Sequence, residues 1–244
     1  MTRRFPRYAV LRVPLIMLEE NLIQIAGVID AAEAQMLRQC GVRYLGFPLR
    51  LPVHREDLTE EKAAAIIKSL APPVFGVLIT YLSEASEIAA FCHALGARIV
   101  QVHNDIDRDE LKRLKTLDPN LTVIKSLVIG MRDDKALEAT LSELSPFVDA
   151  FITDTFDPKT GASGATGRTH DWRVSRRLVE LADRPIILAG GLTPENVKRA
   201  ILEVRPAGVD SHTGVEDCTA RKSREKIQKF LSEAYEAFEL VKAK

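Results

Sequence analysis

Eight short apolar segments alternate with eight amphipathic segments along the 244 residues, and this alternation predicts a single (β/α)8 TIM barrel with a short N-terminal extension. Continuous apolar strands that alternate with helices are typical of a parallel sheet covered by helices. Eight such units in about 220 residues favour a closed barrel over an open, doubly wound sheet. We assign residues 1–20 to the extension and residues 21–244 to the barrel.

The predicted elements follow one another in strict order. The strand segments are rich in Val and Ile, and they are 22–27, 42–47, 74–80, 97–103, 121–129, 148–154, 185–191 and 207–213. The helical segments repeat apolar residues at helical spacing, and they are 30–41, 58–70, 84–96, 109–117, 133–144, 171–182, 193–204 and 223–242. Gly41 and Gly96 have the positions of helix C-caps, and Thr193 followed by Pro194 indicates a helix start.

The composition excludes several classes of protein. Lys plus Arg and Asp plus Glu both total 34, so the net charge is zero and no nucleic-acid partner is indicated. No segment reaches the roughly 18 apolar residues that a membrane span needs. The three cysteines have neither metal-ligand nor disulfide spacing, which favours a cytoplasmic location and no metal site. No organic cofactor is indicated. The sequence does not decide whether the N-terminal extension forms a homodimer contact.

Glycine-rich turns follow the last two predicted strands. Gly190 and Gly191 come after the seventh strand, and Thr213 and Gly214 come after the eighth. In barrels of this kind, the loops after these two strands often bind phosphate through backbone N–H groups. The two turns therefore predict a phosphate site, although glycines also close tight turns that bind nothing.

A third glycine-rich loop follows the sixth strand, and it contains Arg168. Long loops in compact domains are often functional, and this one has the composition of a lid over an anionic ligand. An exposed loop without a role is the alternative.

Several segments resemble the phosphoribosylanthranilate isomerase family of tryptophan biosynthesis. These are GVRYLGF, VQVH, ITDT, GATGRTHDW, ILAGGLTPENV and GVDSHTGVED, and the likeness runs from about Leu22 to the last helix. The resemblance implies a phosphoribosyl-amine ligand and an Amadori-type isomerisation of an aldose to a ketose. It also extends the phosphate site to Gly164 and Gly167 in the lid loop.

The resemblance assigns further roles to single residues. Asp154 in ITDT matches the family's general acid, and Arg55 is the counterpart of an arginine that binds the substrate carboxylate, with Arg50 as the alternative. The family's general base is a cysteine in the segment Lys-(Ile/Val)-Cys-Gly. This chain reads QIAG there, so Gln24 replaces the lysine and Ala26 replaces the cysteine.

Other strand ends offer candidate replacements, because a methyl group cannot accept a proton. His103 ends the fourth strand and is our first candidate for a replacement base, since an ordinary histidine pKa lies near neutrality. His212 after the eighth strand is a second candidate. Gln101, also on the fourth strand, is predicted to contact the substrate.

Three functions stay open at this stage. The first is the family's isomerase reaction with a weakened or relocated base. The second is a related reaction on another phosphorylated sugar. The third is a non-catalytic protein that binds a phosphorylated metabolite.

Overall fold

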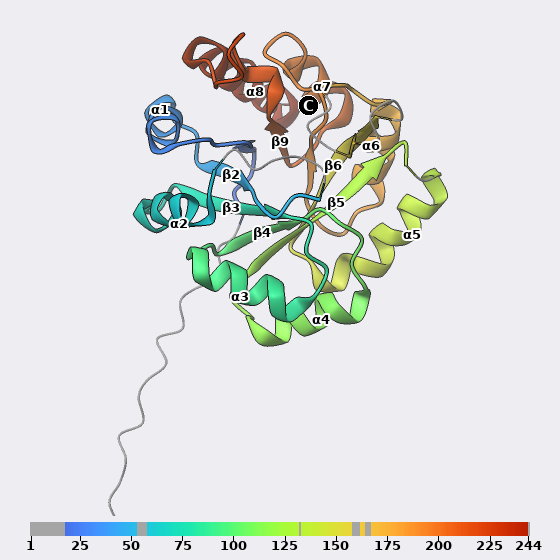
Figure 1. The fold of residues 1–244 in the computed structure, drawn as a ribbon. Helices are drawn as coiled ribbons and strands as arrows, with labels where there is room; N and C mark the ends of the chain where they lie inside the picture. The colour runs from blue at the N-terminus through green and yellow to red at the C-terminus, as the bar shows by residue number, and fades with distance from the viewer. Residues whose placement is uncertain (1–17, 53–57, 132, 158–161, 164–166, 244) are drawn as a thin grey trace, which may run out of the picture.

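The computed structural model describes residues 18–52, 58–131, 133–157, 162–163 and 167–243, and within these ranges eight parallel strands close into a barrel (Figure 1). Helices form a ring around the strands, which confirms the predicted (β/α)8 barrel. Closure depends on the pairing of the first strand with the last, where Leu22 to Ile25 lie opposite Gly208 to Ser211.

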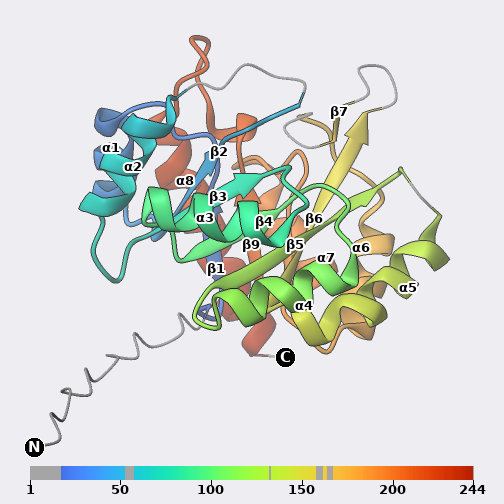
Figure 2. The same ribbon diagram turned by 60° about the horizontal axis from the view of Figure 1, so that its bottom comes forward.

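The strands follow the predicted segments closely. The barrel strands are β1 (Leu22–Ile25), β2 (Tyr44–Pro48), β3 (Phe75–Thr80), β4 (Ile99–Val102), β5 (Thr122–Ile129), β6 (Ala150–Asp157), β8 (Ile186–Leu188) and β9 (Gly208–Ser211). A two-residue strand, β7 (Ala162–Ser163), pairs antiparallel with the end of β6, and Figure 2 shows this pair extending beyond the barrel.

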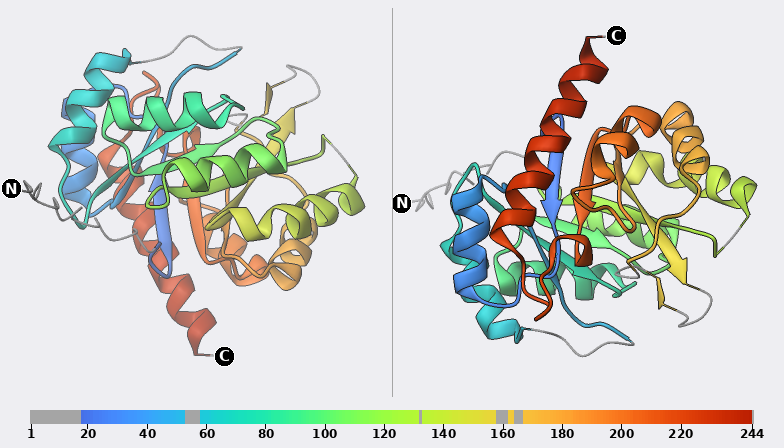
Figure 3. Two further views of the ribbon diagram at one scale, coloured as in Figure 1. Left: turned by 90° about the horizontal axis from the view of Figure 1, so that it is seen from below. Right: turned by 90° about the horizontal axis from the view of Figure 1, so that it is seen from above.

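The helices also match, with small shifts at their ends. They are α1 (Ala31–Cys40), α2 (Glu60–Ser69), α3 (Ala85–Leu95), α4 (Arg108–Leu117), α5 (Asp134–Leu144), α6 (Trp172–Leu181), α7 (Val197–Val204) and α8 (Arg224–Lys242), with 3₁₀ turns η1 (Ser145–Phe147) and η2 (Thr213–Val215). The 19-residue α8 is the longest, and Figure 3 shows its C-terminal end projecting past the barrel. No helix in the described ranges is long and apolar enough to cross a membrane.

The predicted caps are confirmed at two helices and shifted at a third. Gly41 and Gly96 adopt left-handed conformations as the C-caps of α1 and α3. The helix expected from Thr193 begins at Val197 instead, with Asn196 as its N-cap. The Thr193 hydroxyl still accepts a hydrogen bond from the Glu195 N–H at 3.2 Å, so the segment between them forms a turn before the helix proper.

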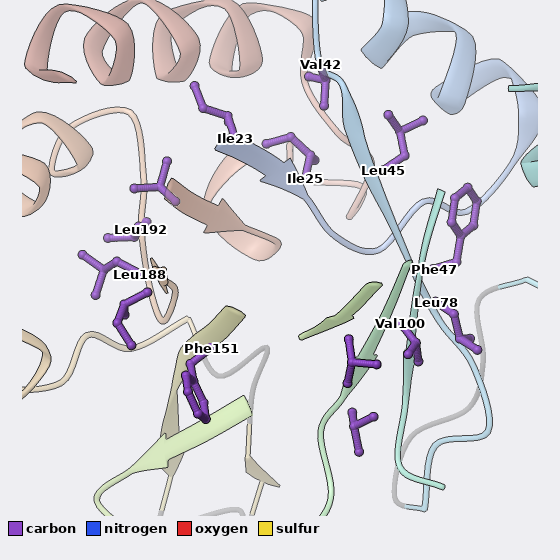
Figure 4. Close-up of a cluster of buried hydrophobic side chains, with 14 of the residues drawn as sticks. Ile23, Ile25, Val42, Leu45, Phe47, Leu78, Val100, Phe151, Leu188 and Leu192 are labelled. Carbon is purple, nitrogen blue, oxygen red and sulfur yellow. The ribbon is translucent and has the colours of Figure 1, made fainter. Parts of the chain in front are cut away.

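Each strand has one face inside the barrel and one face against the helices, as the two-residue period of a strand requires. On β1, Ile23 and Ile25 pack outward, whereas Leu22 and Ala26 belong to the smaller cluster inside the barrel. Figure 4 shows side chains of this kind, among them Ile23, Phe47 and Phe151, in the layer between barrel and helices.

Phe151 tests the contribution of the outer layer. Its side chain is fully buried between β6 and the helices. We expect Phe151→Ala to lower the free energy of unfolding by about 3–5 kcal/mol, since it removes a large buried ring and leaves a cavity. Leu117→Ala is the control, because Leu117 is 51% exposed and its truncation should change stability little. Urea denaturation of the two variants measures the difference, and equal stabilities would contradict this packing.

Candidate active site

Polar side chains gather where the barrel strands end. Asp154 lies on the inner face of β6, and His103 directly follows β4. On β9, Val209 packs outward, so the strand period turns Asp210 inward. Since all the barrel strands are parallel, these side chains share the carboxyl end of the barrel, where enzymes of this fold carry their active sites.

Asp154 has the environment of a proton donor. Its side chain is 14% exposed, and its Oδ1 accepts a hydrogen bond from the Thr155 N–H at 2.8 Å. Burial raises the pKa of Asp154 to about 7, against a smaller lowering by the Thr155 N–H. A large fraction of this carboxyl therefore stays protonated at neutral pH, as a general acid requires.

His103 lies beside that carboxyl. Its Nδ1 is 4.0 Å from the Asp154 Oδ2, and its ring centroid is 4.6 Å from that of Tyr81. The imidazole is buried next to this carboxyl. His103 is distant in the sheet from Ala26, because β4 is separated from β1 by two strands on one side of the barrel and by four on the other. Its role as a base therefore stays a prediction.

Our sequence analysis did not single out Asp210. This residue is 9% exposed, and its Oδ1 has no hydrogen-bond partner among the described residues. Burial and then the negative charge of Asp154 raise the pKa of Asp210 to about 7, while the Gln24 side chain and the charge of Lys222 act in the opposite direction. The alternation of inward and outward residues on β9 is the signal that could have revealed it.

Gln24 and Gln101 lie in the barrel interior, in the same chain of hydrogen bonds. The Gln24 Nε2 donates to the Gln101 Oε1 at 3.0 Å, and the Gln101 Nε2 donates to the Ser126 Oγ at 3.3 Å. This chain links β1, β4 and β5 across the interior of the barrel. Both glutamines are buried, so substrate contact by Gln101 stays a prediction.

Ala26 faces the interior next to β2 and β9. Its N–H donates to the Ser211 carbonyl at 3.0 Å. The His212 ring packs directly against Gly27, so closely that a side-chain carbon added to this glycine would overlap it. Burial lowers the pKa of His212 to about 3, helped by the charge of Lys222, so this imidazole is uncharged at neutral pH.

The turn after β8 is the centre of the predicted phosphate site. Gly190 and Gly191 have φ angles of +102° and +61°, a conformation that side chains disfavour. A side-chain carbon on Gly190 would overlap the Thr155 hydroxyl, and one on Gly191 would overlap the backbone of Arg168. The turn is thus pressed against both the end of β6 and the loop that follows it.

The loop after β9 approaches the same place. A side-chain carbon on Gly214 would overlap the Leu192 carbonyl, which also accepts a hydrogen bond from the Ser211 hydroxyl at 2.8 Å. The Thr213 Oγ1 lies 3.5 Å from the position that a Gly167 Cβ would occupy. The structure therefore brings together Gly167, Gly190, Gly191, Thr213 and Gly214, as a shared phosphate site requires.

His170 braces this end of the barrel, a role that our sequence analysis missed. Its Nδ1 is 2.9 Å from the Thr155 Oγ1 and its Nε2 is 2.6 Å from the Ser175 Oγ. Burial lowers its pKa to about 4, so the ring is uncharged and bridges two hydroxyl groups. It links the end of β6, next to Asp154, to α6.

Two predicted site residues, Arg55 and Gly164, lie outside the described residues. Arg50, the alternative to Arg55, forms hydrogen bonds of 2.8 and 3.2 Å to Glu60, and its guanidinium stacks 3.8 Å from the Phe91 ring centroid. These contacts hold Arg50 against α2 and α3. Within the described ranges, no group of three His, Cys, Asp or Glu residues is placed to hold a metal ion.

Comparison with known proteins gives consistent matches. The model of the N-(5'-phosphoribosyl)anthranilate (PRA) isomerase family matches residues 23–233. N-(5'-phosphoribosyl)anthranilate isomerase 2 of Methanosarcina mazei is 36% identical over 88% of this chain and 95% of its own.

Solved structures give the same result. The N-(5'-phosphoribosyl)anthranilate isomerase of Pyrococcus furiosus has a TM-score of 0.73 and is 26% identical, over 88% of this chain and 99% of its own. A phosphoribosyl anthranilate isomerase solved in complex with reduced 1-(o-carboxyphenylamino)-1-deoxyribulose 5-phosphate has a TM-score of 0.72 and is 25% identical, over the same shares of the two chains.

The phosphate site can be tested by adding a side-chain carbon to its central turn. We expect Gly191→Ala to weaken binding of ribose 5-phosphate at least about tenfold, because the added methyl group displaces the Arg168 backbone. Gly41→Ala is the matched control, since Gly41 also has a positive φ but has nothing within 4 Å of the added carbon. Isothermal titration calorimetry measures both affinities, and unchanged binding by Gly191→Ala would contradict a site at this turn.

Proposed function

The chain belongs to the N-(5'-phosphoribosyl)anthranilate isomerase family and is a phosphoribosylanthranilate isomerase-like protein, and we propose that it catalyses this isomerisation with Asp154 as general acid. The reaction class is an intramolecular conversion of an aldose amine to a ketose amine. It serves tryptophan biosynthesis.

One observation carries the proposed mechanism. A buried carboxyl with a pKa raised to about 7 lies at the barrel mouth, one residue before Thr155, whose hydroxyl contacts the Gly190 turn. A ligand whose phosphate sits in that turn extends its sugar toward Asp154. Anchoring the phosphate therefore positions the sugar ring for proton transfer.

The first chemical step follows from this arrangement. Asp154 gives its proton to the ring oxygen of the phosphoribosyl group as the bond from that oxygen to C1 breaks. The nitrogen lone pair forms a C1=N bond and so replaces the lost electron pair. Removal of the C2 proton then needs a base, and the methyl group of Ala26 cannot provide it.

The phosphate end supports binding and positioning. Backbone N–H groups of the turns at Gly190–Gly191 and Thr213–Gly214 would bind the phosphate oxygens, with Gly167 closing from the lid loop. The uncharged His170 keeps Thr155 in place between this site and Asp154. These groups are neutral, so they recognise the anion mainly through hydrogen bonds.

Two alternatives use the same phosphate site. A related barrel enzyme would act on a different phosphorylated sugar, and a binding protein would hold such a sugar without turnover. Retention of an elevated-pKa carboxyl beside the phosphate turns favours an enzyme, because binding alone has no need for a buried proton donor.

The isomerase assay of the purified protein with N-(5'-phosphoribosyl)anthranilate tests this proposal. We expect turnover by the unmodified protein and a loss of about 10²–10⁴-fold in kcat for Asp154→Asn, because an amide cannot donate the required proton. Asp183→Asn is the control, since Asp183 is an exposed residue before β8, at the opposite end of the barrel.

The outcomes separate the alternatives. Absence of turnover by the unmodified protein, together with binding of ribose 5-phosphate, would replace the isomerase with the binding protein or with another substrate. Turnover that survives Asp154→Asn would leave the isomerase function standing and remove Asp154 as its acid.

A further inference from the structure

We propose that Asp210 is the general base of this protein, taking the C2 proton that no side chain at position 26 can accept. This assignment rests on the proposed isomerase function and deepens it. It follows from where Asp210 sits, from what its carboxyl contacts and from the charges around it.

The position of Asp210 brings it beside Ala26. β9 pairs directly with β1, with Asp210 opposite Gln24 and Ser211 opposite Ile25. The Ala26 N–H continues this ladder to the Ser211 carbonyl at 3.0 Å. Asp210 therefore points into the barrel from the strand next to β1. It lies at the level of Gln24, one layer of side chains below Ala26.

The carboxyl of Asp210 keeps an oxygen available. Its Oδ1 is buried and has no hydrogen-bond partner among the described residues. Gln24, its opposite neighbour, donates a side-chain N–H to Gln101, and its hydrogen bond to the Asp210 carboxyl lowers the pKa of that group while leaving Oδ1 without a partner. A buried acceptor without a partner is unfavourable in a folded protein, and a substrate proton would satisfy it.

The charged and titratable groups around Asp210 favour a base that works near neutral pH. Asp154 faces it from β6, and Lys222 acts on it from the loop after β9. Lys222 is itself held by the Glu216 carboxylate at 2.6 Å, which limits its effect on Asp210. His212 from the same loop is uncharged, and the Nδ1 of His103 lies 4.0 Å from the Asp154 Oδ2.

Two buried carboxyls in one site favour the state with a single shared proton, because a second negative charge is repelled by the first. Burial raises the pKa of each group to about 7, and the charge of Asp154 adds to the rise at Asp210. In the singly protonated state, one carboxyl is an acid and the other is a base.

The other candidate bases are less suitable. His212 has a pKa lowered to about 3, so it is a weak base. Cys92 is buried in α3, and burial raises the pKa of its thiol to about 12. Cys40 ends α1, and Cys218 is exposed in the turn after η2.

The proton inventory balances without any further reactant. Asp154 donates one proton to the ring oxygen, and C1=N forms as the C1–O bond breaks. Asp210 then takes the C2 proton, the C2–H pair becomes a C1=C2 bond, and the C1=N pair returns to nitrogen. Asp210 then gives this proton to C1 as the enol hydroxyl loses its own proton to Asp154, which forms the C2=O bond of the ketone and restores both carboxyls to their starting states. No net oxidation or reduction occurs.

The kinetic test compares Asp210→Asn with the unmodified protein on N-(5'-phosphoribosyl)anthranilate. We expect kcat to fall at least about 10²-fold while KM changes little, since the amide keeps the shape but cannot accept the proton. The pH profile of the unmodified protein should be bell-shaped, with an acid limb from the ionisation of Asp210. A second variant, Ala26→Cys with Asp210→Asn, should regain at least about tenfold over Asp210→Asn alone, because a thiolate beside position 210 can take the same proton.

Each outcome decides the assignment. A kcat within threefold of the unmodified protein, or a loss confined to KM, would overturn the role of Asp210 and leave the isomerase function intact. Failure of the unmodified protein to turn over would instead overturn the proposed function, and the role of Asp210 with it. Asp183→Asn again serves as the control for purification and folding.

A stability measurement separates a functional carboxyl from a structural one. The folded-state pKa of Asp210 lies above its unfolded value, so its contribution to stability is largest below about pH 4 and is lost as pH rises toward 7. We expect Asp210→Asn to raise Tm at pH 8, and to raise it less or not at all at pH 4.5. A Tm lowered equally at both pH values would show that Asp210 is structural and would overturn the assignment.

Discussion

Desolvation of two carboxyl groups inside a closed barrel is the constraint on which the chemistry of this protein depends. Asp154 and Asp210 face the same interior from β6 and β9, and burial raises the pKa of both. Buried carboxyl groups with raised pKa values are found most often at functional sites. Removing either charge would stabilise the barrel, and on the proposed mechanism it would also remove a proton-transfer group, so stability and activity are opposed at these two positions.

The two halves of the barrel mouth have different properties. The side formed by the loops after β6, β8 and β9 has glycine turns pressed against one another and braced by His170, which suits a fixed anion site. On the side formed by β1, our sequence analysis expects Gln24 and Ala26 to replace a lysine and a cysteine of the family. Both differences bear on Asp210, because Gln24 lies opposite it and Ala26 lies beside it. A lysine opposite Asp210 would hold the carboxyl ionised and weakly basic, whereas the neutral glutamine leaves its pKa high.

The sequence predicted the fold well because each βα unit has a recognisable pattern of apolar residues. Continuous apolar strands, helical spacing and the C-caps at Gly41 and Gly96 all agree with the closed barrel. The start of α7 was wrong by three residues, since the Thr193 turn satisfies its own backbone groups before the helix begins. The C-terminal ends of parallel strands lie at the same end of a barrel, so the loops that follow them were predictably close together. These loops contain Gly167, Gly190, Gly191, Thr213 and Gly214.

The proposed base, Asp210, was harder to predict than the proposed acid, Asp154. Asp154 stands in a motif and at a strand end, whereas Asp210 is in mid-strand and resembles any aspartate in a polar segment. Its importance depends on the inward direction of its side chain and on the charge of Asp154 across the barrel, and both are tertiary properties. His170 was missed for a similar reason, because its two hydroxyl partners come from β6 and α6.

The measurement that tests this account most directly is a carbon-13 NMR titration of the aspartate carboxyls in the full-length protein, with Asp154→Asn and Asp210→Asn used to assign the two signals. The account predicts that the pair takes up its first proton near pH 7, well above the ordinary range of aspartate. In the single variants, the remaining carboxyl should titrate at a lower pH than in the pair, because the neighbouring charge is gone. Titration of both carboxyls near pH 4 in the unmodified protein would contradict it.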